Sequence, residues 1–284
     1  MFARKCTIFE ILSIGAFLCA PALADDISIG LFDELKFRHV GPEGNRTIAA
    51  TGIPGDPQTY YIGAASGGLW KTSDGGLTWD AVFDDQDVSS VGAVAVSRSD
   101  SNIVWAGTGE TNVRSSISIG NGVYKSVDGG ETWQHKGLTE TARIGRIIIH
   151  PEDPDIVYVA GLGTAYGPQE ERGIFRTSDG GETWERVLFT DPGTGGIEIT
   201  MHPDNPDTLI AGMWPIHIRT WGRYSGGPNG GLYKTSDGGE SWNKLTNGLP
   251  HGDIGNVSVT YAPSDPNNVY ALIETDQTRF DGVL

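Results

Sequence analysis

Residues 173–184 read GIFRTSDGGETW, and close copies of this stretch occur at residues 68–79, 122–133 and 231–242. The copies read GLWKTSDGGLTW, GVYKSVDGGETW and GLYKTSDGGESW. Their closing tryptophans follow one another at intervals of about 50 to 60 residues, a period typical of propeller blades and other repeat architectures. The chain is therefore expected to fold as a series of similar units.

Each copy lies in a longer unit that contains four short apolar stretches. In the third unit we expect strands at 146–150, 156–161, 173–177 and 184–188, which we call strands A, B, C and D. These stretches alternate apolar with polar residues, are rich in β-branched side chains and are separated by Gly, Pro and Asp. One four-stranded meander in about 50 residues is the pattern of a propeller blade, whereas a ribbon-like β-solenoid usually has shorter repeats.

The predicted fold is therefore all-β: a β-propeller of four-stranded blades, with four blades and part of a fifth in this chain, as part of a larger propeller. The propeller domain is placed at 25–284. Its units are expected at about 36–83, 84–136, 137–188, 189–246 and, in part, 247–284. The stretch 36–40 precedes the first strand A as a strand D would, so it is a candidate for closing the last blade.

The first 24 residues have the features of a secretory signal. A basic start and an apolar middle lead to Ala22-Leu23-Ala24, after which cleavage is expected. A single membrane anchor is the alternative. Cleavage would leave a secreted or periplasmic chain without stable membrane insertion. Because Cys6 and Cys19 both lie in this segment, the mature chain would have neither a disulfide nor a thiolate metal ligand.

The charge of the chain limits its partners. It has 20 Lys and Arg residues against 36 Asp and Glu residues, a formal net charge of −16. This excess of acidic groups argues against nucleic acid or an anionic membrane as a partner. The six histidines show no metal-ligand spacing, and no phosphate loop or redox motif is present. We therefore expect neither a metal site nor a cofactor.

The repeated stretch itself is expected to be a structural turn between strands C and D. Its Asp can accept hydrogen bonds from the amides of the turn, its glycines allow positive φ, and its Trp supplies a large apolar anchor. Catalysis by four equivalent aspartates would require four separate sites. The residues given this structural role are Asp74, Trp79, Asp128, Trp133, Asp179, Trp184, Asp237 and Trp242.

The candidate binding residues lie in the connections between strands B and C. In a meander these connections share the face opposite the repeated turns, and the long ones are expected at 108–121, 162–172 and 214–230. Aromatic rings beside arginines and carboxylates suit the stacking of sugar rings and the binding of hydroxyl or acidic groups. The alternative is that the aromatics pack the loops and the charges pair with one another. The candidates are Arg114, Tyr166, Arg172, Trp214, Arg219, Trp221 and Arg223.

Two further residues, Arg146 and Glu198, occupy equivalent positions near the start of strand A in neighbouring units. They could form a salt bridge that closes the central channel of the propeller, or a polar floor for a ligand pocket at the mouth of that channel. A glycosidase needs two carboxyl groups, about 5 Å apart for retention or about 6.5 to 9.5 Å apart for inversion. The carboxyl candidates are Glu110, Glu170, Glu171 and Glu198.

The motifs of the chain also resemble those of a known family. FRHVGP (37–42), AASGGLWKTSDGGLTW (64–79), WAGTGETNVRSS (105–116) and SGGPNGGLYKTSDGGESW (225–242) are similar to motifs of secreted bacterial Asp-box, or BNR-type, repeat propellers. The resemblance covers residues 33–284 and extends to the sortilin propeller and to glycosyl hydrolases of the sialidase and xyloglucanase superfamilies. In that family the repeated turn is the Asp box.

The resemblance implies three functions. The first is an extracytoplasmic recognition module that binds glycan or protein through its B–C loops. The second is a glycoside hydrolase acting at the same face. The third is a sortilin-like receptor for a peptide or protein, which would use the channel wall. Xyloglucanases place their catalytic Asp in an Arg-Thr-Asp-hydrophobic-Gly-Gly context, and the corresponding stretch here is the plain turn at 71–76.

Overall fold

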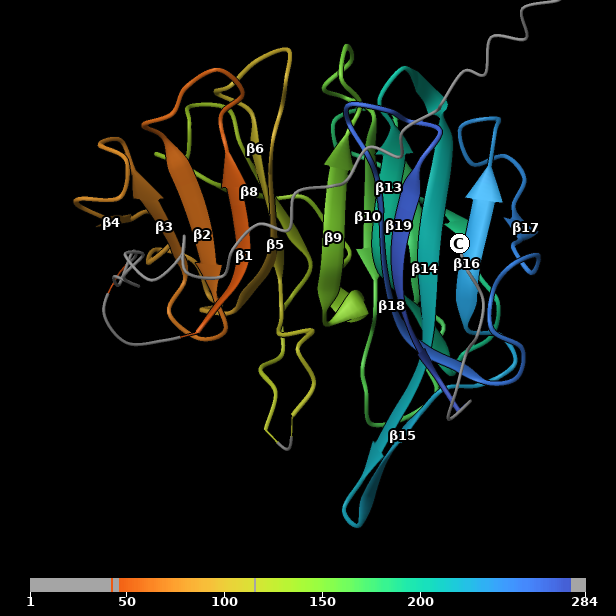
Figure 1. Cartoon of the computed structure of the whole chain (residues 1–284). Coiled ribbons are helices and arrows are strands. Elements are labelled where there is room, and N and C mark those ends of the chain that lie inside the picture. The colour runs from red at the N-terminus through yellow and green to blue at the C-terminus, as the bar shows by residue number, and fades with distance from the viewer. Residues whose placement is uncertain (1–41, 43–45, 115, 277–284) are drawn as a thin grey trace, which may run out of the picture. The chain divides into compact units, whose positions relative to one another are not determined.

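The computed structural model describes residues 42, 46–114 and 116–276, which belong to one compact unit, Val40–Leu284. Figure 1 shows that the regular secondary structure of the described chain consists almost entirely of strands. The signal-like segment 1–24, the stretch 36–40 and the last residues of the partial fifth unit, 277–284, lie outside the described residues.

The strands form five antiparallel sheets in chain order. The first sheet contains β1 (Thr47–Gly52), β2 (Tyr60–Ala64), β3 (Leu69–Thr72) and β4 (Asp80–Ala81). The second contains β5 (Val91–Val96), β6 (Val104–Thr108), β7 (Val123–Ser126) and β8 (Gln134–His135). A 3-10 helix, η2 (Thr139–Thr141), precedes the third sheet, which contains β9 (Ile144–Ile149), β10 (Val157–Gly161), β11 (Gly173–Thr177) and β12 (Glu185–Leu188). The fourth contains β13 (Thr194–His202), β14 (Asn205–Arg219), β15 (Gly222–Ser225), β16 (Gly231–Thr235) and β17 (Asn243–Lys244), and the fifth contains β18 (Ile254–Tyr261) and β19 (Val269–Thr275).

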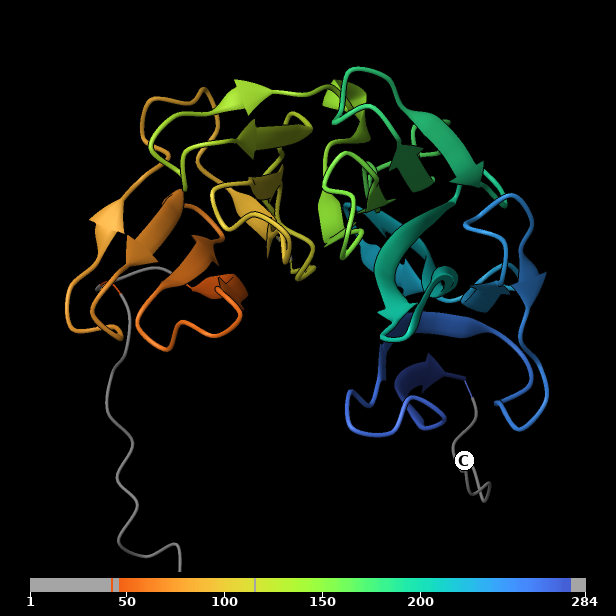
Figure 2. The ribbon, with the colours of Figure 1, turned by 90° about the horizontal axis from the view of Figure 1, so that it is seen from above.

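Each of the first three sheets is a simple four-stranded meander, and the fourth follows the order β13-β14-β16-β17 with β15 added to β14. The fifth consists of the two strands expected for a partial unit. The prediction of an all-β propeller built from four-stranded blades is therefore confirmed. The first strands of neighbouring sheets lie side by side, β1 with β5, β5 with β9, β9 with β13 and β13 with β18 (Figure 2).

One connection differs from the prediction. Residues 214–230 were expected to be a B–C loop, but β14 continues to Arg219 and then pairs with β15, with Arg219 opposite Gly222. The reason is visible in the sequence WPIHIRTWGRYS, where Ile216 and Ile218 alternate with polar residues and favour an extended strand. The B–C connection of this sheet thus contains a β-hairpin, in which β14 pairs with β15.

The four repeated turns share one set of hydrogen bonds. In the second copy, Thr132 donates its amide to Asp128 Oδ1 at 2.9 Å and its hydroxyl to Asp128 Oδ2 at 2.6 Å. Ser126 donates its hydroxyl to Asp128 Oδ1 at 2.7 Å and accepts the Gly130 amide at 2.8 Å. The same pattern recurs around Asp74, Asp179 and Asp237. The aspartates therefore hold the turns, and their acceptor oxygens are occupied by neighbours in the chain.

The turns also join each sheet to the sheet before it. Tyr61 on β2 donates its hydroxyl to the carbonyl of Gly129 in the second turn at 2.8 Å, and Tyr158 on β10 does the same to Gly238 in the fourth at 2.7 Å. Trp133 packs edge-on against Phe83 and donates Nε1–H to the Val82 carbonyl at 2.7 Å. The tryptophan expected to anchor its own blade thus packs against the preceding one.

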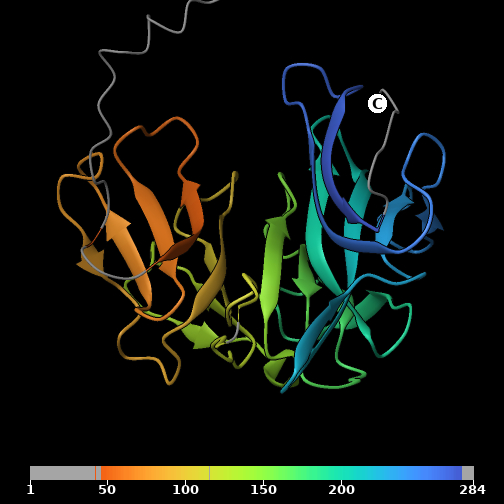
Figure 3. The same cartoon turned by 60° about the horizontal axis from the view of Figure 1, so that its bottom comes forward.

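The B–C connections leave the sheets at one face, at the bottom of Figure 1, and the β14–β15 hairpin projects farthest from it. Figure 3 brings this face forward and shows the hairpin beside the other connections. The repeated turns lie at the opposite end of the strands. The scaffold therefore separates its joining turns from its long connections.

Candidate binding site on the loop face

The β14–β15 hairpin is fixed at its base by a chain of hydrogen bonds. Trp214 donates its indole N–H to Ser225 Oγ at 2.8 Å, and Ser225 donates to Glu274 on β19 at 2.5 Å. Glu274 also accepts the Asn256 amide at 2.7 Å. Trp214 is only 3 % exposed and packs with Leu162, Ala165 and Ile216. Its ring therefore supports the hairpin and exposes little surface to a ligand.

The neighbouring connection, 162–172, is held by Arg172. This side chain is fully buried and donates to the carbonyls of Gly193 at 2.7 Å, Gly167 at 3.0 Å and Thr164. Burial lowers the pKa of Arg172 to about 10, so the guanidinium remains a cation at neutral pH. The connection meets the hairpin where Ile218 donates its amide to the Ala165 carbonyl at 2.6 Å. Arg172 thus shapes the site from beneath.

A second buried arginine, Arg143, was not among the sequence candidates. It is fully buried, its guanidinium carbon lies 5.7 Å from the centre of the Tyr166 ring, and its bonds to the carbonyls of Gly163 and Ile117 are long, at 3.4 and 3.5 Å. Burial lowers its pKa. A single arginine just before an apolar strand gives no sequence signal of burial, because most arginines in such positions are exposed.

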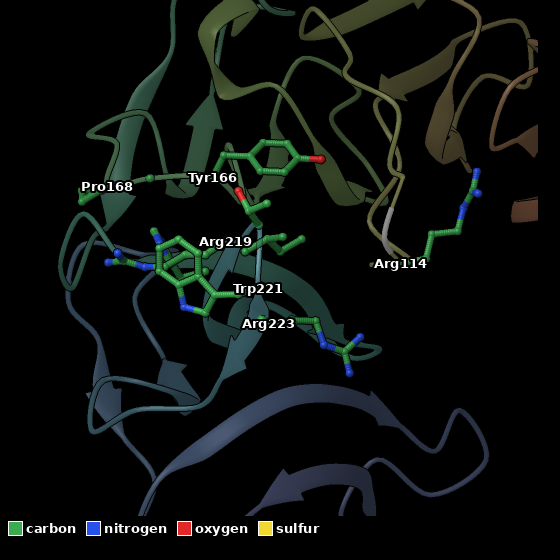
Figure 4. Close-up of a pocket in the computed structure, with 11 residues that line it drawn as sticks. Arg114, Tyr166, Pro168, Arg219, Trp221 and Arg223 are labelled. Carbon is green, nitrogen blue, oxygen red and sulfur yellow. The ribbon is translucent and has the colours of Figure 1, made fainter.

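The hairpin and the neighbouring connections line an open pocket of about 950 Å³, which we call the hairpin pocket (Figure 4). Figure 4 shows Tyr166 on one side, Trp221 and Arg223 on the other and Arg114 farther along the cavity. Trp221 is 75 % exposed and lies against Arg219, whose guanidinium carbon is 5.7 Å from the ring centre. The structure therefore brings together five sequence candidates from three separate connections.

A second cavity, of about 680 Å³, adjoins the first, and we call it the channel-mouth pocket. Arg114 and Arg223 line both cavities. The channel-mouth pocket is also lined by Arg46, Trp214, Asn256 and Glu274. The two cavities therefore form one extended surface with two arginines at their junction.

The four carboxyl candidates are not gathered in either pocket. Glu110 is buried between Arg46 and Arg114, with its Oε1 3.1 Å from Arg114 Nε. Burial tends to raise the pKa of Glu110, but the bonds from Arg114, Arg46 and the Ser118 amide outweigh it, so the pKa lies below its usual value. Glu170 and Glu171 are exposed.

The fourth candidate, Glu198, lies on the inner strand β13. It accepts a hydrogen bond from Arg146 Nε at 2.6 Å and a weaker one from Ser258 at 3.3 Å. Burial raises its pKa, although Arg146 opposes the shift. Both residues follow a β-bulge at the same place in β9 and β13, which explains why equivalent repeat positions meet across neighbouring sheets. The salt bridge weighed in the sequence analysis is present.

Within the described part of the chain, no three histidine, cysteine, aspartate or glutamate side chains lie close enough together to hold a metal ion. No helix among the described residues is long and apolar enough to cross a membrane.

The fold shows that this chain is a β-propeller protein. Its candidate binding surface lies on the face from which the B–C connections project. The family model described as "Sortilin, neurotensin receptor 3," matches residues 121–279, more than half of the chain. The chain therefore belongs to the Sortilin-Vps10 family. This confirms the sortilin-like part of the resemblance found in the sequence.

Similar proteins extend the resemblance to xyloglucanases. A probable oligoxyloglucan-reducing end-specific xyloglucanase of Neosartorya fischeri is 32 % identical over 152 residues, which are 50 % of this chain and 17 % of that protein. The photosystem II assembly lipoprotein Ycf48 of a Synechococcus species is 26 % identical over 243 residues, 77 % of this chain and 65 % of that protein. The crystal structure of an ancestral GH74 enzyme superposes with a TM-score of 0.62 and 20 % identity, over 85 % of this chain and 31 % of that chain, which shows the shared fold. The chain spans between 17 % and 24 % of the length of the xyloglucanases it matches.

Proposed function

We propose that this chain is an extracytoplasmic recognition module that binds a glycan in the hairpin pocket. The observation that carries the proposal is the pairing of two exposed aromatic rings, Trp221 and Tyr166, with arginines in one pocket of about 950 Å³. Aromatic faces suit the apolar faces of sugar rings, and guanidinium groups suit their hydroxyl and acidic substituents. The volume falls in the range typical of ligand sites. The signal-like first 24 residues support a secreted or periplasmic location.

The rigidity of the site supports recognition. The hairpin is a paired strand rather than a free loop, its base is fixed through Trp214, and the facing connection is clamped by Arg172. A pre-formed site loses little conformational entropy when a ligand binds. None of the described residues that line the hairpin pocket is a carboxylate, so the groups assembled there suit binding better than acid–base chemistry.

The proposal is tested by isothermal titration of the purified protein with a panel of neutral and acidic polysaccharides. Trp221→Ala should abolish or strongly weaken the binding that the unmodified protein shows. Tyr270→Ala is the matched control, because Tyr270 is also an exposed aromatic residue, at 66 %, and lines neither pocket. A panel without any binding polysaccharide, or equal affinities for both variants, would contradict the proposal.

A second candidate function is glycoside hydrolysis at the channel wall. It is favoured by the raised pKa of Glu198, a property of carboxyl groups that act as general acids, and by the similarity to proteins named as xyloglucanases. Release of new reducing ends that is lost in Glu198→Gln would establish it. A protein-binding role, as in a sortilin-like receptor, would instead give a purified protein partner and no polysaccharide binding in the same titrations.

A further inference from the structure

We infer that the ligand is an acidic polysaccharide, a chain of sugars bearing carboxylates, which lies across the hairpin and channel-mouth pockets and is held by Arg219 in the hairpin pocket and by Arg223 at the junction. This inference rests on the proposed function and adds the chemical class and the length of the ligand.

The charge of the hairpin pocket is opposite to that of the chain. The protein carries a net charge of −16, yet Arg114, Arg219 and Arg223 line this pocket and none of its described lining residues is acidic. Arg219 lies against Trp221, and Arg223 donates to the Val113 carbonyl at 3.3 Å. Neither pairs with a carboxylate in the described part of the chain. These two cations are therefore open to an anionic ligand.

The buried arginines add positive charge beneath the pocket. Arg143 and Arg172 are fully buried, bond to backbone carbonyls, and leave Nε without a hydrogen-bond partner among the described residues. Asp191 attracts Arg172 and Glu110 attracts Arg143, so these two carboxylates offset part of the buried positive charge, whereas Arg219 and Arg223 in the pocket add positive charge that no described carboxylate pairs with. In a low-dielectric interior the charges of the buried arginines act over longer distances than at the surface. Their field favours an anion in the pocket above them.

The arrangement of the cavities indicates a chain rather than a single sugar. Two cavities of about 950 and 680 Å³ meet at Arg114 and Arg223, so one ligand can occupy both. Arg114 is paired with Glu110, which leaves Arg223 as the shared arginine open to a ligand carboxylate. Glu274 also lines the channel-mouth pocket, where its carboxylate accepts hydrogen bonds from Ser225 and Asn256. Guanidinium groups bind carboxylates with two parallel hydrogen bonds. Tyr166 and Trp221 lie at the hairpin end, where they can stack on sugar rings. This combination favours a polyuronate over an acidic peptide, which would have no sugar faces for the rings.

The test compares oligogalacturonate with its carboxyl-reduced form, with neutral xyloglucan and with poly-glutamate, by isothermal titration. We expect oligogalacturonate to bind, its carboxyl-reduced form to bind at least about tenfold more weakly, and the affinity to fall when NaCl rises from 50 to 200 mM, as charge pairing requires. The double variant Arg219→Gln/Arg223→Gln should raise the Kd for oligogalacturonate by about tenfold or more. Arg98→Gln, an exposed arginine that lines neither pocket, is the matched control and should leave the Kd unchanged.

The titrations distinguish a glycan site without preference for acidic sugars from the absence of a glycan site. Binding of xyloglucan with no preference for oligogalacturonate would overturn the acidic-ligand inference and leave the glycan site standing. Equal binding of poly-glutamate would overturn it in favour of an acidic peptide. No binding of any glycan would overturn both. A Kd that falls in steps as oligogalacturonates lengthen, up to the length that fills both cavities, would support the chain-like ligand, and a Kd independent of length would contradict it.

Discussion

The indole of Trp184 stands edge-on to that of Trp105 in the preceding sheet, with ring centroids 5.9 Å apart and ring planes at 86°. Its Nε1–H also donates to the Lys136 carbonyl of that sheet at 2.6 Å. Gly181, in the same turn at φ 92°, packs so closely that an added Cβ would lie 2.6 Å from the Trp105 ring. The repeated turn is thus a joint between sheets, which explains why it is repeated once in each unit.

We predict that Trp184→Ala lowers the free energy of unfolding by about 3 kcal/mol, because a large half-buried ring is lost from the joint. Trp184→Phe should cost less, about 1 kcal/mol, since mainly the hydrogen bond to Lys136 is lost. Urea unfolding measures both. Trp221→Ala serves as the control, because this exposed ring packs in no described core cluster and its removal should leave stability unchanged.

A second prediction concerns pH. Hydrogen bonds from the Thr132 hydroxyl and amide and from the Ser126 hydroxyl lower the pKa of Asp128 from its ordinary value of 3.8 to about 2. Because the folded state binds this proton less readily than the unfolded state, the stabilisation is complete above about pH 4 and is lost as the pH falls through about 2. Asp74 and Asp237 have pKa values of about 2 for the same reason.

Asp128→Asn should therefore unfold at a lower temperature than the unmodified protein at pH 7, and the difference should shrink as the pH approaches 2. Asp85→Asn is the control, because Asp85 is exposed and its carboxylate holds no repeated turn. A difference that stayed the same from pH 7 to pH 2 would show that the charge of Asp128 plays no part in holding the turn.

The repeat architecture could be predicted from the sequence because the blade is a local unit. Alternation in IGRIII and VYVAG fixes which side chains face the neighbouring sheet, and the SDGG turn sets the next strand in place. The sequence did not show that the tryptophans of the repeated turns pack against the preceding sheet. Which residue meets Trp184 depends on how successive sheets pack, and a pattern within one unit carries no such information.

The sequence indicated which connections carry the candidate residues, but not which of those side chains are exposed. The B–C connections were expected to carry it, and Arg114, Tyr166, Arg219, Trp221 and Arg223 do meet in one pocket. Trp214 and Arg172 are also a tryptophan and an arginine of these connections, but both side chains are buried. Sequence shows which side chains belong to a connection, but whether each faces solvent depends on the register of the β14–β15 hairpin and on contacts between distant units.

The third prediction concerns Arg172, the buried side chain that holds the connection 162–172. Arg172→Met would leave the carbonyls of Gly167 and Gly193 without their donor, at a cost of about 3 kcal/mol in the free energy of unfolding. The connection 162–172 should also become more sensitive to limited proteolysis than the rest of the chain. Arg98→Met should change neither property. Equal protease resistance of Arg172→Met and the unmodified protein would show that the connection is held by other contacts.

The last prediction concerns the pair on the inner strands. Burial raises the pKa of Glu198, and the guanidinium of Arg146 at 2.6 Å opposes the rise. Arg146→Met removes the opposing charge, so the pKa of Glu198 should rise further. Because a carboxyl whose pKa is raised in the folded state favours folding only in its protonated form, the stability of this variant relative to the unmodified protein at the same pH should be highest at low pH. The deficit of the variant should grow as the pH rises through the raised pKa. Titration of the carboxyl carbon by NMR gives the pKa, and unfolding at several pH values gives the stability. An unchanged pKa in Arg146→Met would show that the close contact contributes little to the protonation of Glu198.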